Sequence, residues 1–113
     1  MSMATNDVLA ERQRQMDAEG WTDEHDDAHG VGELSAAGMC YAGHACLTLR
    51  GKGGATVPSP WPWADEWWKP KNPRRDLVRA AALLIAEIER LDREALKTPN
   101  AELSGRPLAD GPA

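Results

Sequence analysis

One stretch constrains the fold more than any other, the segment KNPRRDLVRAAALLIAEIERLDREALK at residues 71–97. Asn72 is a good helix N-cap, and Pro73 fits the first helical position because its fixed φ suits a helix start. Apolar residues then recur at helical spacing, which predicts the longest helix of the chain and the spine of its core. The residues of this predicted apolar face are Leu77, Ala81, Leu84, Ile88, Leu91 and Ala95.

Two earlier segments also carry helical signals. Residues 5–19 are rich in helix formers, with Thr5, Asn6 or Asp7 able to cap the start and Gly20 placed to end the helix. The segment ELSAAGMCYAGHACLTL at 33–49 places small residues along one face, which implies close packing against another helix. That predicted face consists of Leu34, Ala37, Gly38, Tyr41, Ala45 and Thr48.

The size of the chain limits its core. Among 113 residues there are 18 Ala, only 17 Leu, Ile or Val, five Trp and no Phe. We therefore expect a small all-α domain over residues 1–97, built as a bundle of three main helices with an irregular Trp/Pro-rich segment. Residues 98–113 are polar with Pro and Gly, which predicts a flexible, disordered C-terminal tail. The Ala-rich faces of the two later helices favour a homo-oligomer.

Charge and cysteine content exclude some classes of protein. A formal net charge of −5 argues against broad binding to duplex nucleic acid, so any anion site must be local. Cys40 and Cys46 lack CxxC spacing, and no apolar run is long enough to span a membrane. We expect a soluble, reduced, cytosolic protein with no membrane partner.

The segment WPWADEWWKPKNPRR, residues 61–75, combines four tryptophans with a run of cations. Arg74 and Arg75 occupy the first turn of the predicted long helix, although the positive end of a helix dipole favours acidic residues. This conflict predicts a bound anion, held by the two arginines, Lys69 and backbone N–H groups. A base or ribose would then lie against Trp61, Trp67 or Trp68.

A structural interpretation of the same segment stays open. Trp-Pro-Trp stretches also fold back over small cores as a plug, which would bury some of these rings. In that case the neighbouring cations would form surface ion pairs with Asp65, Glu66 or Asp76.

Acidic residues and a histidine form a second constellation. If a helix continues through Gly30 and Gly32, then Asp26, His29 and Glu33 share one side of it. Glu89 and Asp92 of the long helix could face them, and such a set would hold Mg²⁺, Mn²⁺ or Zn²⁺. The alternative is a solvated acidic turn, with Asp92 paired to a cation from another helix.

The chain resembles a family of small proteins of tailed bacteriophages and prophages. The resemblance rests on the blocks ERQRQ, EGWTDEHDDAH, GELSAAGMCYA, WPWADEWWKP and RRDLVRAAALLIAEIERLDR, and it covers about residues 10 to 93. It implies a phage protein that acts in the cytoplasm of a bacterial host.

Two weaker resemblances concern activity. The MazG-type nucleoside triphosphate pyrophosphohydrolases pair ExxE with ExxD around Mg²⁺; here Glu89 and Asp92 match ExxD, whereas no ExxE precedes them. Phage proteins that sequester immune signalling nucleotides instead combine aromatic stacking with cations and need no catalytic metal.

These observations leave three hypotheses for function. The chain sequesters a nucleotide as an anti-defence protein, hydrolyses one with Mg²⁺, or blocks a host enzyme through its tryptophan surface. Capture is the favoured hypothesis, and the state of the two cysteines stays open.

Overall fold

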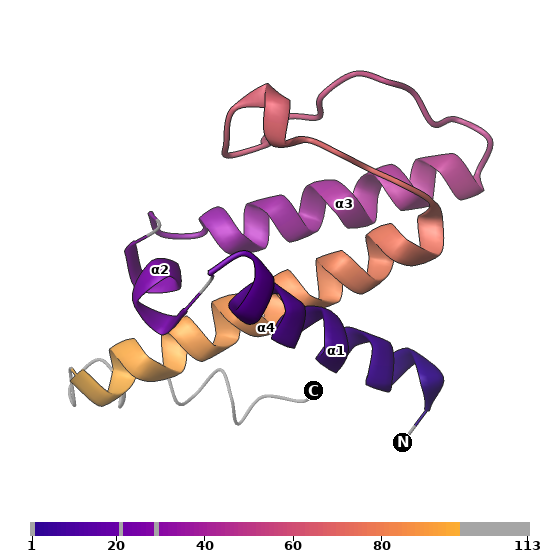
Figure 1. Ribbon diagram of the computed structural model, residues 1–113. Helices are drawn as coiled ribbons and strands as arrows, with labels where there is room; N and C mark the ends of the chain where they lie inside the picture. Colours follow the sequence, from indigo (N-terminus) through magenta and orange to yellow (C-terminus); the bar gives the residue numbers. More distant parts are fainter. Residues whose placement is uncertain (1, 21, 29, 98–113) are drawn as a thin grey trace, which may run out of the picture.

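The computed structural model describes residues 2–20, 22–28 and 30–97. These ranges contain no strand and form α1 (Met3–Ala18), α2 (Asp23–Ala28), α3 (Glu33–Leu49), the short 3-10 helix η1 (Asp65–Trp67) and α4 (Pro73–Lys97), as Figure 1 shows. The expected all-α class with three main helices is thereby confirmed. The predicted flexible tail at 98–113 lies outside the described residues.

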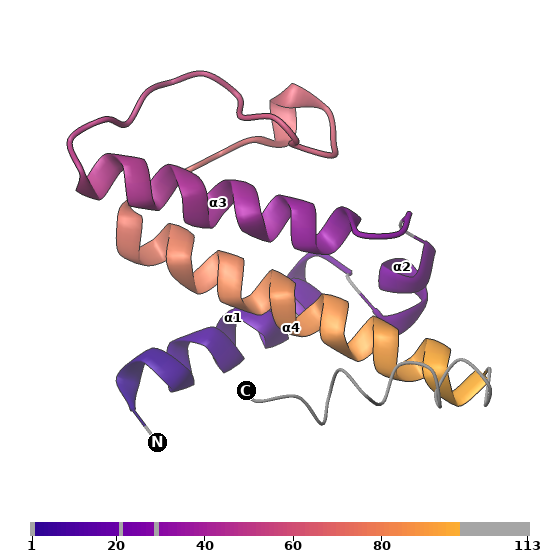
Figure 2. The same ribbon diagram turned by 180° about the vertical axis from the view of Figure 1, so that it is seen from behind.

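Helix α4 organises the fold because it contacts every other α-helix. It lies between α3 and α1, packs most extensively on α3, and also touches α2 (Figures 1 and 2). Its start is built as the sequence predicts: the Asn72 side chain accepts the Arg75 N–H at 2.9 Å. Buried Asp76 in turn accepts the Lys71 N–H at 2.9 Å, which fixes the chain as it enters the helix.

The core lies between α3 and α4. Ala80, Leu83 and Ala86 of α4 are buried against α3 residues that include Leu34 and Tyr41. A Cβ added at Gly38 would lie only 3.2 Å from the carbonyl oxygen of Ala80. The close packing expected from the small residues of α3 is therefore present, although Thr48, placed on the same face by its spacing, is exposed.

The prediction of which face of α4 is buried is wrong. Leu77, Leu84, Ile88 and Leu91 keep 44%, 43%, 57% and 51% of their surface exposed. Helical spacing shows only that residues share a face, and it cannot show which face meets the neighbouring helices. Against α1 and α3, α4 instead turns a surface made of alanines, Leu83 and charged residues that are paired.

Helix α1 is held to the bundle mainly through polar side chains. Ser2, rather than Thr5, Asn6 or Asp7, caps it by accepting the Thr5 N–H at 3.1 Å. Arg12, 4% exposed, donates to the fully buried Asp26 of α2 at 2.8 Å. A paired charge of this kind satisfies groups that would otherwise be costly to bury.

Helix α2 is a single short element, capped by the Thr22 side chain, which accepts the His25 N–H at 3.3 Å. It ends at Ala28, and α3 begins at Glu33 after Gly32, whose φ of +79° is in the left-handed region that favours glycine. The continuous helix through Gly30 and Gly32 is therefore absent. Asp26 and Glu33 lie on different helices.

None of the helices in the described ranges has the length and apolar character required to cross a bilayer.

Candidate functional site

The tryptophan segment folds back over α3, and one of its rings joins the core. Trp68, 9% exposed, stacks on Tyr41 with ring centroids 4.8 Å apart. Trp61 meets Trp68 edge-on at 5.0 Å, and Trp63 meets Trp61 at 5.3 Å. The plug interpretation therefore applies to Trp68, which is too deeply buried to serve as an open stacking surface.

Hydrogen bonds fix the outer part of the segment. Trp63 Nε1 donates to Glu33 Oε1 at 3.0 Å, and Trp61 Nε1 donates to the Ala64 carbonyl oxygen at 3.1 Å. Glu33 also accepts the Gly30 N–H at 2.7 Å, so this predicted metal ligand ties the segment to the start of α3. The Trp63 ring is thus tied to α3, and the Trp61 ring is tied to the backbone of its own segment.

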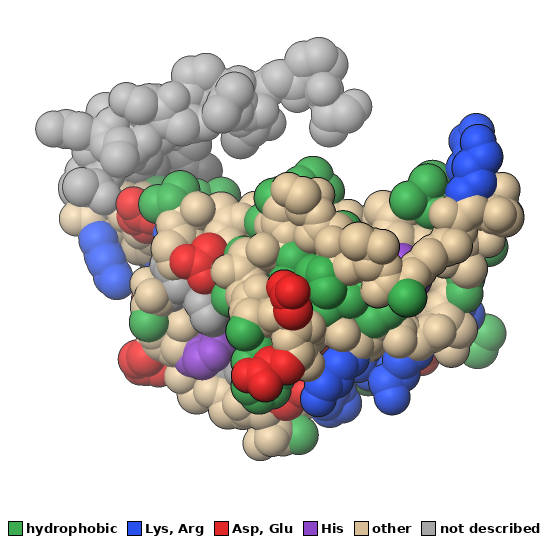
Figure 3. Space-filling view, turned by 90° about the horizontal axis from the view of Figure 1, so that it is seen from above, with side chains coloured by type: hydrophobic (Ala, Val, Ile, Leu, Met, Phe, Trp, Pro, Cys, Tyr) green, Lys and Arg blue, Asp and Glu red, His purple; other side chains and the backbone are tan. Residues whose placement is uncertain are grey.

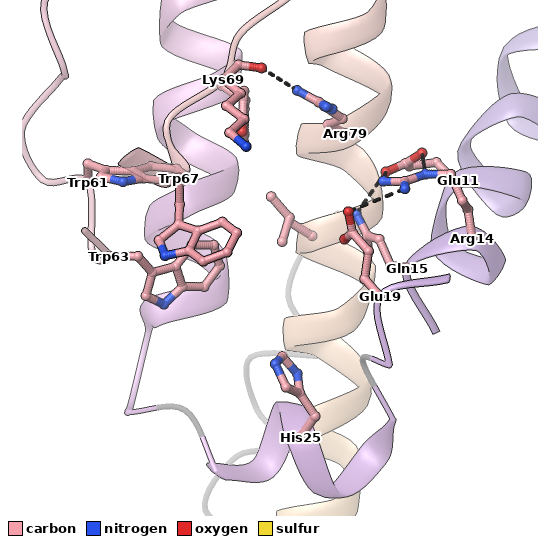
Figure 4. Close-up of a pocket in the computed structure, with 12 residues that line it drawn as sticks. Glu11, Arg14, Gln15, Glu19, His25, Trp61, Trp63, Trp67, Lys69 and Arg79 are labelled. Carbon is pink, nitrogen blue, oxygen red and sulfur yellow. Dashed lines mark hydrogen bonds and ion pairs between the residues drawn. The ribbon is translucent and has the colours of Figure 1, made fainter. Parts of the chain in front are cut away.

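A cavity of about 540 Å³ lies between the tryptophan segment, α1 and α4. Figure 4 shows Trp61, Trp63 and Trp67 on one side and the α1 side chains on the other, with Lys69 and Arg79 toward one end and His25 toward the opposite end. The volume is in the range of small-molecule sites. The cavity is lined by Glu11, Arg14, Gln15, Glu19, His25, Tyr41, Trp61, Trp63, Trp67, Lys69, Arg79 and Leu83.

Two cations at one end of the cavity contact aromatic rings. The Lys69 ammonium lies 5.5 Å from the centre of the Trp67 ring, and the Arg79 guanidinium lies 5.4 Å from that of Tyr41. Arg79 Nη1 also donates to the Lys69 carbonyl oxygen at 2.6 Å, which fixes its side chain. Within the described ranges neither cation forms an ion pair with a carboxylate.

The α1 side of the cavity contains a polar row. Arg14 donates to Glu11 at 2.8 Å and to Glu19 at 3.3 Å. Burial alone would raise the pKa of Glu11, but hydrogen bonds and charge from Arg14 and Arg75 outweigh it and hold that pKa below its usual value. Both Glu11 and Arg14 therefore stay charged and mutually neutralised at neutral pH.

Gln15 contributes an unsatisfied acceptor. Its side chain is 2% exposed, and its Nε2 donates to Glu11 Oε2 at 3.2 Å. A carboxylate accepts only from the NH₂ group, so the amide orientation is fixed by chemistry. Gln15 lines the cavity, and its Oε1 is buried without a hydrogen-bond partner among the described residues. An unpaired buried acceptor is costly.

The two arginines predicted to hold an anion have partners within the chain. Arg74 pairs with Asp7 of α1 at 2.8 Å, and Arg75 pairs with the buried Glu11. They line a separate cavity of about 390 Å³ on the other side of Glu11 and Arg14. The positive charge at the start of α4 is therefore balanced by carboxylates of α1 and needs no ligand for this purpose.

The predicted metal ligands do not converge. Asp26 and Glu89 both bind Arg12, at 2.8 and 3.1 Å, while Glu33 binds the tryptophan segment. Asp92 is exposed on α4, and His29 lies outside the described residues. Across the described ranges no group of three or more His, Cys, Asp or Glu residues is arranged to hold a metal ion.

A histidine and a buried carboxylate meet at the end of the cavity opposite Lys69. His25 Nδ1 lies 3.2 Å from Asp26 Oδ1, and His25 lines the cavity. The bond to Asp26, which Arg12 also holds, orients the imidazole. Neither residue was assigned a role in the cavity from the sequence.

Of the residues predicted to bind a ligand, Trp61, Trp67 and Lys69 line the cavity, whereas Trp68 is buried. The cavity residues of α1, together with Arg79 and His25, are not among the predicted site residues. Weak signals for the missing residues exist: Glu11, Gln15 and Glu19 recur every four residues, and Arg79 follows Arg75 by one helical turn. Spacing of this kind indicates a shared face without showing what that face meets.

Seen from above, hydrophobic side chains occupy the middle of the surface, and several Lys and Arg side chains lie together along one edge (Figure 3).

No protein-family model, curated protein or solved structure matches the chain. The site must therefore be interpreted from its own geometry.

Proposed function

We propose that the chain binds a nucleotide-type ligand in the tryptophan-walled cavity and holds it intact. One observation carries the proposal: three tryptophan rings form a wall beside two cations that lack carboxylate partners within the described ranges. An aromatic base and an anionic phosphate are the two halves of a nucleotide, and they require these two kinds of surface next to each other.

The base would stack on the tryptophan wall. Trp67 is 60% exposed, and Trp61 and Trp63 are half-buried with their ring nitrogens already hydrogen-bonded. Rings fixed in this way lose little conformational freedom when a ligand arrives. Stacking of one base on such a ring contributes about 1–3 kcal/mol.

The phosphate would lie between Lys69 and Arg79. Arg14 is less suited because Glu11 and Glu19 already neutralise it. Arg74 and Arg75, which the sequence favoured, are paired with Asp7 and Glu11 outside the cavity. The proposal therefore moves the phosphate from the first turn of α4 to a position one turn further along, at Arg79.

Gln15 would contact the base after its side chain turns toward the cavity, because its Oε1 is buried in the structure as it stands. Its unpaired Oε1 can only accept, so the ligand must present an N–H group on the α1 side of the cavity. Exocyclic amino groups of adenine, cytosine or guanine provide one. An N–H donor at this point would satisfy an acceptor that is otherwise buried without a partner.

The resemblance to phage proteins supports a biological setting for capture. We propose that the chain acts as a homo-oligomer in the cytoplasm of a bacterial host, where it withdraws a signalling nucleotide of the host immune system. Capture needs only tight binding, which the cavity residues provide without a metal cluster.

Hydrolysis of the bound nucleotide is the second candidate. The observation that favours it is His25, which lies at the cavity end with its Nδ1 3.2 Å from the buried Asp26. An imidazole oriented by a carboxylate is a common general base. This candidate assigns water activation to His25 and differs from the predicted Mg²⁺ mechanism, whose ligands are dispersed.

The test is a binding panel on the purified chain. Mononucleotides of each base, cyclic dinucleotides and ADP-ribose are titrated calorimetrically, with Mg²⁺ and with EDTA, and the mixtures are then heat-denatured and chromatographed. Ligand recovered unchanged supports capture, and a product that fails to form with His25→Ala supports hydrolysis. If no member of the panel binds, the proposal is wrong and a protein partner for the tryptophan surface becomes the better hypothesis.

A further inference from the structure

We propose that the exposed apolar face of α3 and α4 is the contact between two copies of this chain. The inference depends on that face alone and is independent of the proposed ligand. On α4 the face carries Leu77, Leu84, Ile88 and Leu91, each between 43% and 57% exposed. Their spacing of seven, four and three residues keeps them on one side of the helix, as in helices that pair along an apolar seam.

Helix α3 continues this face. Glu33 is its only Asp, Glu, Lys or Arg residue, and a helix with so little charge is normally buried on all sides. Yet Met39 is 55% exposed, and Gly43 and Cys46 are exposed beside the partly buried Ala42. Among these four residues of α3, only Met39 has a large side chain.

The two rows lie on the same side of the helix pair. Arg79 of α4 contacts the Tyr41 ring of α3 at 5.4 Å, and this side is covered by the tryptophan segment and α1. At 100° per residue, Met39 and Cys46 point away from Tyr41, just as Leu77 and Ile88 point away from Arg79. Figure 2 looks onto α3 and α4 from behind, where α1 lies on the far side of α4.

A second copy fits this face better than a charged partner. The row of large side chains on α4 lies beside a row of small ones on α3. Leu84 is in contact with α3 at Gly38, since a Cβ added at Gly38 would lie 3.4 Å from the Leu84 side chain. A twofold axis along the pair would place the large row of each copy on the small row of the other. These side chains are uncharged, and Asp92, four residues after Ile88, lies exposed at the edge of the face, where its carboxylate can stay in water.

The size of the face is also appropriate. At 1.5 Å per residue, α3 and α4 are about 25 and 37 Å long, and side by side they are about 20 Å wide. The outline of the pair, roughly 500–700 Å² per copy, is an upper limit for the area of the face and approaches the ~800 Å² that each partner contributes to a standard interface. The cavity opens on the other side of the helix pair, so both copies could bind ligand.

Sedimentation velocity of the full chain between 1 and 100 micromolar, on the order of typical dimer affinities, tests the inference. The expected species has twice the chain mass of 12.3 kDa. Ile88→Glu on α4 and Met39→Glu on α3 should each raise the dimer dissociation constant at least 30-fold, the order of magnitude for an interface hot spot. Leu9→Glu, at a similarly exposed position on α1, should leave the dimer intact.

Circular dichroism of each variant separates dissociation from unfolding. Exposed positions tolerate glutamate, so all three variants should keep the helical signal of the wild type. A wild-type chain that sediments as a monomer throughout would overturn the inference, whether the face is covered by residues 98–113 or by nothing. A dimer that survives both Ile88→Glu and Met39→Glu would overturn it equally, because the contact would then lie elsewhere.

Discussion

Arg75 at the start of α4 pairs with Glu11 of α1, a carboxylate whose side chain is only 1% exposed. Glu11 also accepts from Arg14 and Gln15, so one buried carboxylate joins the start of the longest helix to the wall of the cavity. The anion predicted to bind at Arg75 is therefore a carboxylate of the protein itself, that of Glu11. Its position explains why the free positive charge lies further along, at Lys69 and Arg79.

Acid should weaken the fold through Glu11 and Glu87. Burial raises the pKa of each, but hydrogen bonds from Arg14 and Arg75 to Glu11, and from Arg90 and Ser35 to Glu87, lower it below the usual 4.5. Below pH 4.5 the unfolded chain then binds more protons than the folded one. The free energy of unfolding should be constant above this range and fall as the pH drops through the folded pKa values.

Urea titrations between about pH 2 and pH 7 measure this dependence, since carboxyl groups titrate within that range. Glu87→Gln should reduce the slope below pH 4.5 because one of the two carboxyls is removed. An unfolding free energy that rises on acidification would contradict the assignment.

Loss of Arg12 should destabilise the protein strongly. Arg12→Ala leaves the fully buried Asp26 without its charge partner, which typically costs about 3–5 kcal/mol. Arg12→Met combined with Asp26→Asn should recover part of the loss, because no buried charge then remains. Gln13→Ala, which removes an exposed hydrogen bond to Asp17, should change the unfolding free energy by less than about 0.5 kcal/mol. Chemical denaturation of the four proteins compares these values, and equal costs for Arg12→Ala and Gln13→Ala would contradict the role of the pair.

Two neighbouring tryptophans should respond in opposite ways. Trp68→Ala removes a buried ring stacked on Tyr41 and should cost about 3–5 kcal/mol of stability. Trp67→Ala, at an exposed ring, should cost less than about 1 kcal/mol of stability but weaken nucleotide binding by about 1–3 kcal/mol. Denaturation and calorimetric titration of both variants separate the two effects. If Trp67→Ala binds nucleotide as tightly as the wild type, the Trp67 ring has no part in stacking.

Gln15 should determine which bases bind. Removing the amino group from the preferred nucleotide, for example by comparing adenosine monophosphate with purine riboside monophosphate, should weaken binding by about 1–3 kcal/mol. Gln15→Met removes the acceptor and should abolish this preference while keeping the volume similar. Equal discrimination in wild type and variant would show that Gln15 Oε1 does not contact the base, even if nucleotide binding itself is observed.

The helices could be predicted from the sequence because their signals are local. Asn72 and Pro73 define the start of α4 wherever the rest of the chain lies, and the small residues of α3 indicate a close neighbour. The identity of the buried face of α4 could not be predicted in the same way. The sequence favours Leu84 as a core residue over Ala80. The positions of α1 and α3 decide that Ala80 is buried and Leu84 is exposed.

The candidate site depends still more on long-range contacts. Glu11 and Arg75 are 64 positions apart, so the sequence around the first turn of α4 gives no sign of their ion pair. The sequence predicts Asp26 and Glu89 as metal ligands, but in the structure both accept hydrogen bonds from Arg12. The tryptophans that line the cavity could be singled out because four tryptophans lie within eight residues of a short chain.

The central claim concerns the cations of the cavity, and one comparison tests it most directly. Binding of the best nucleotide from the panel is measured calorimetrically for wild type, Lys69→Ala with Arg79→Ala, and Arg74→Ala. We predict that the double variant binds at least about 30-fold more weakly, as expected when two charge-assisted contacts are lost, whereas Arg74→Ala, on the surface with Asp7, binds like the wild type. Unchanged affinity in the double variant, or a comparable loss in Arg74→Ala, would contradict the placement of the phosphate.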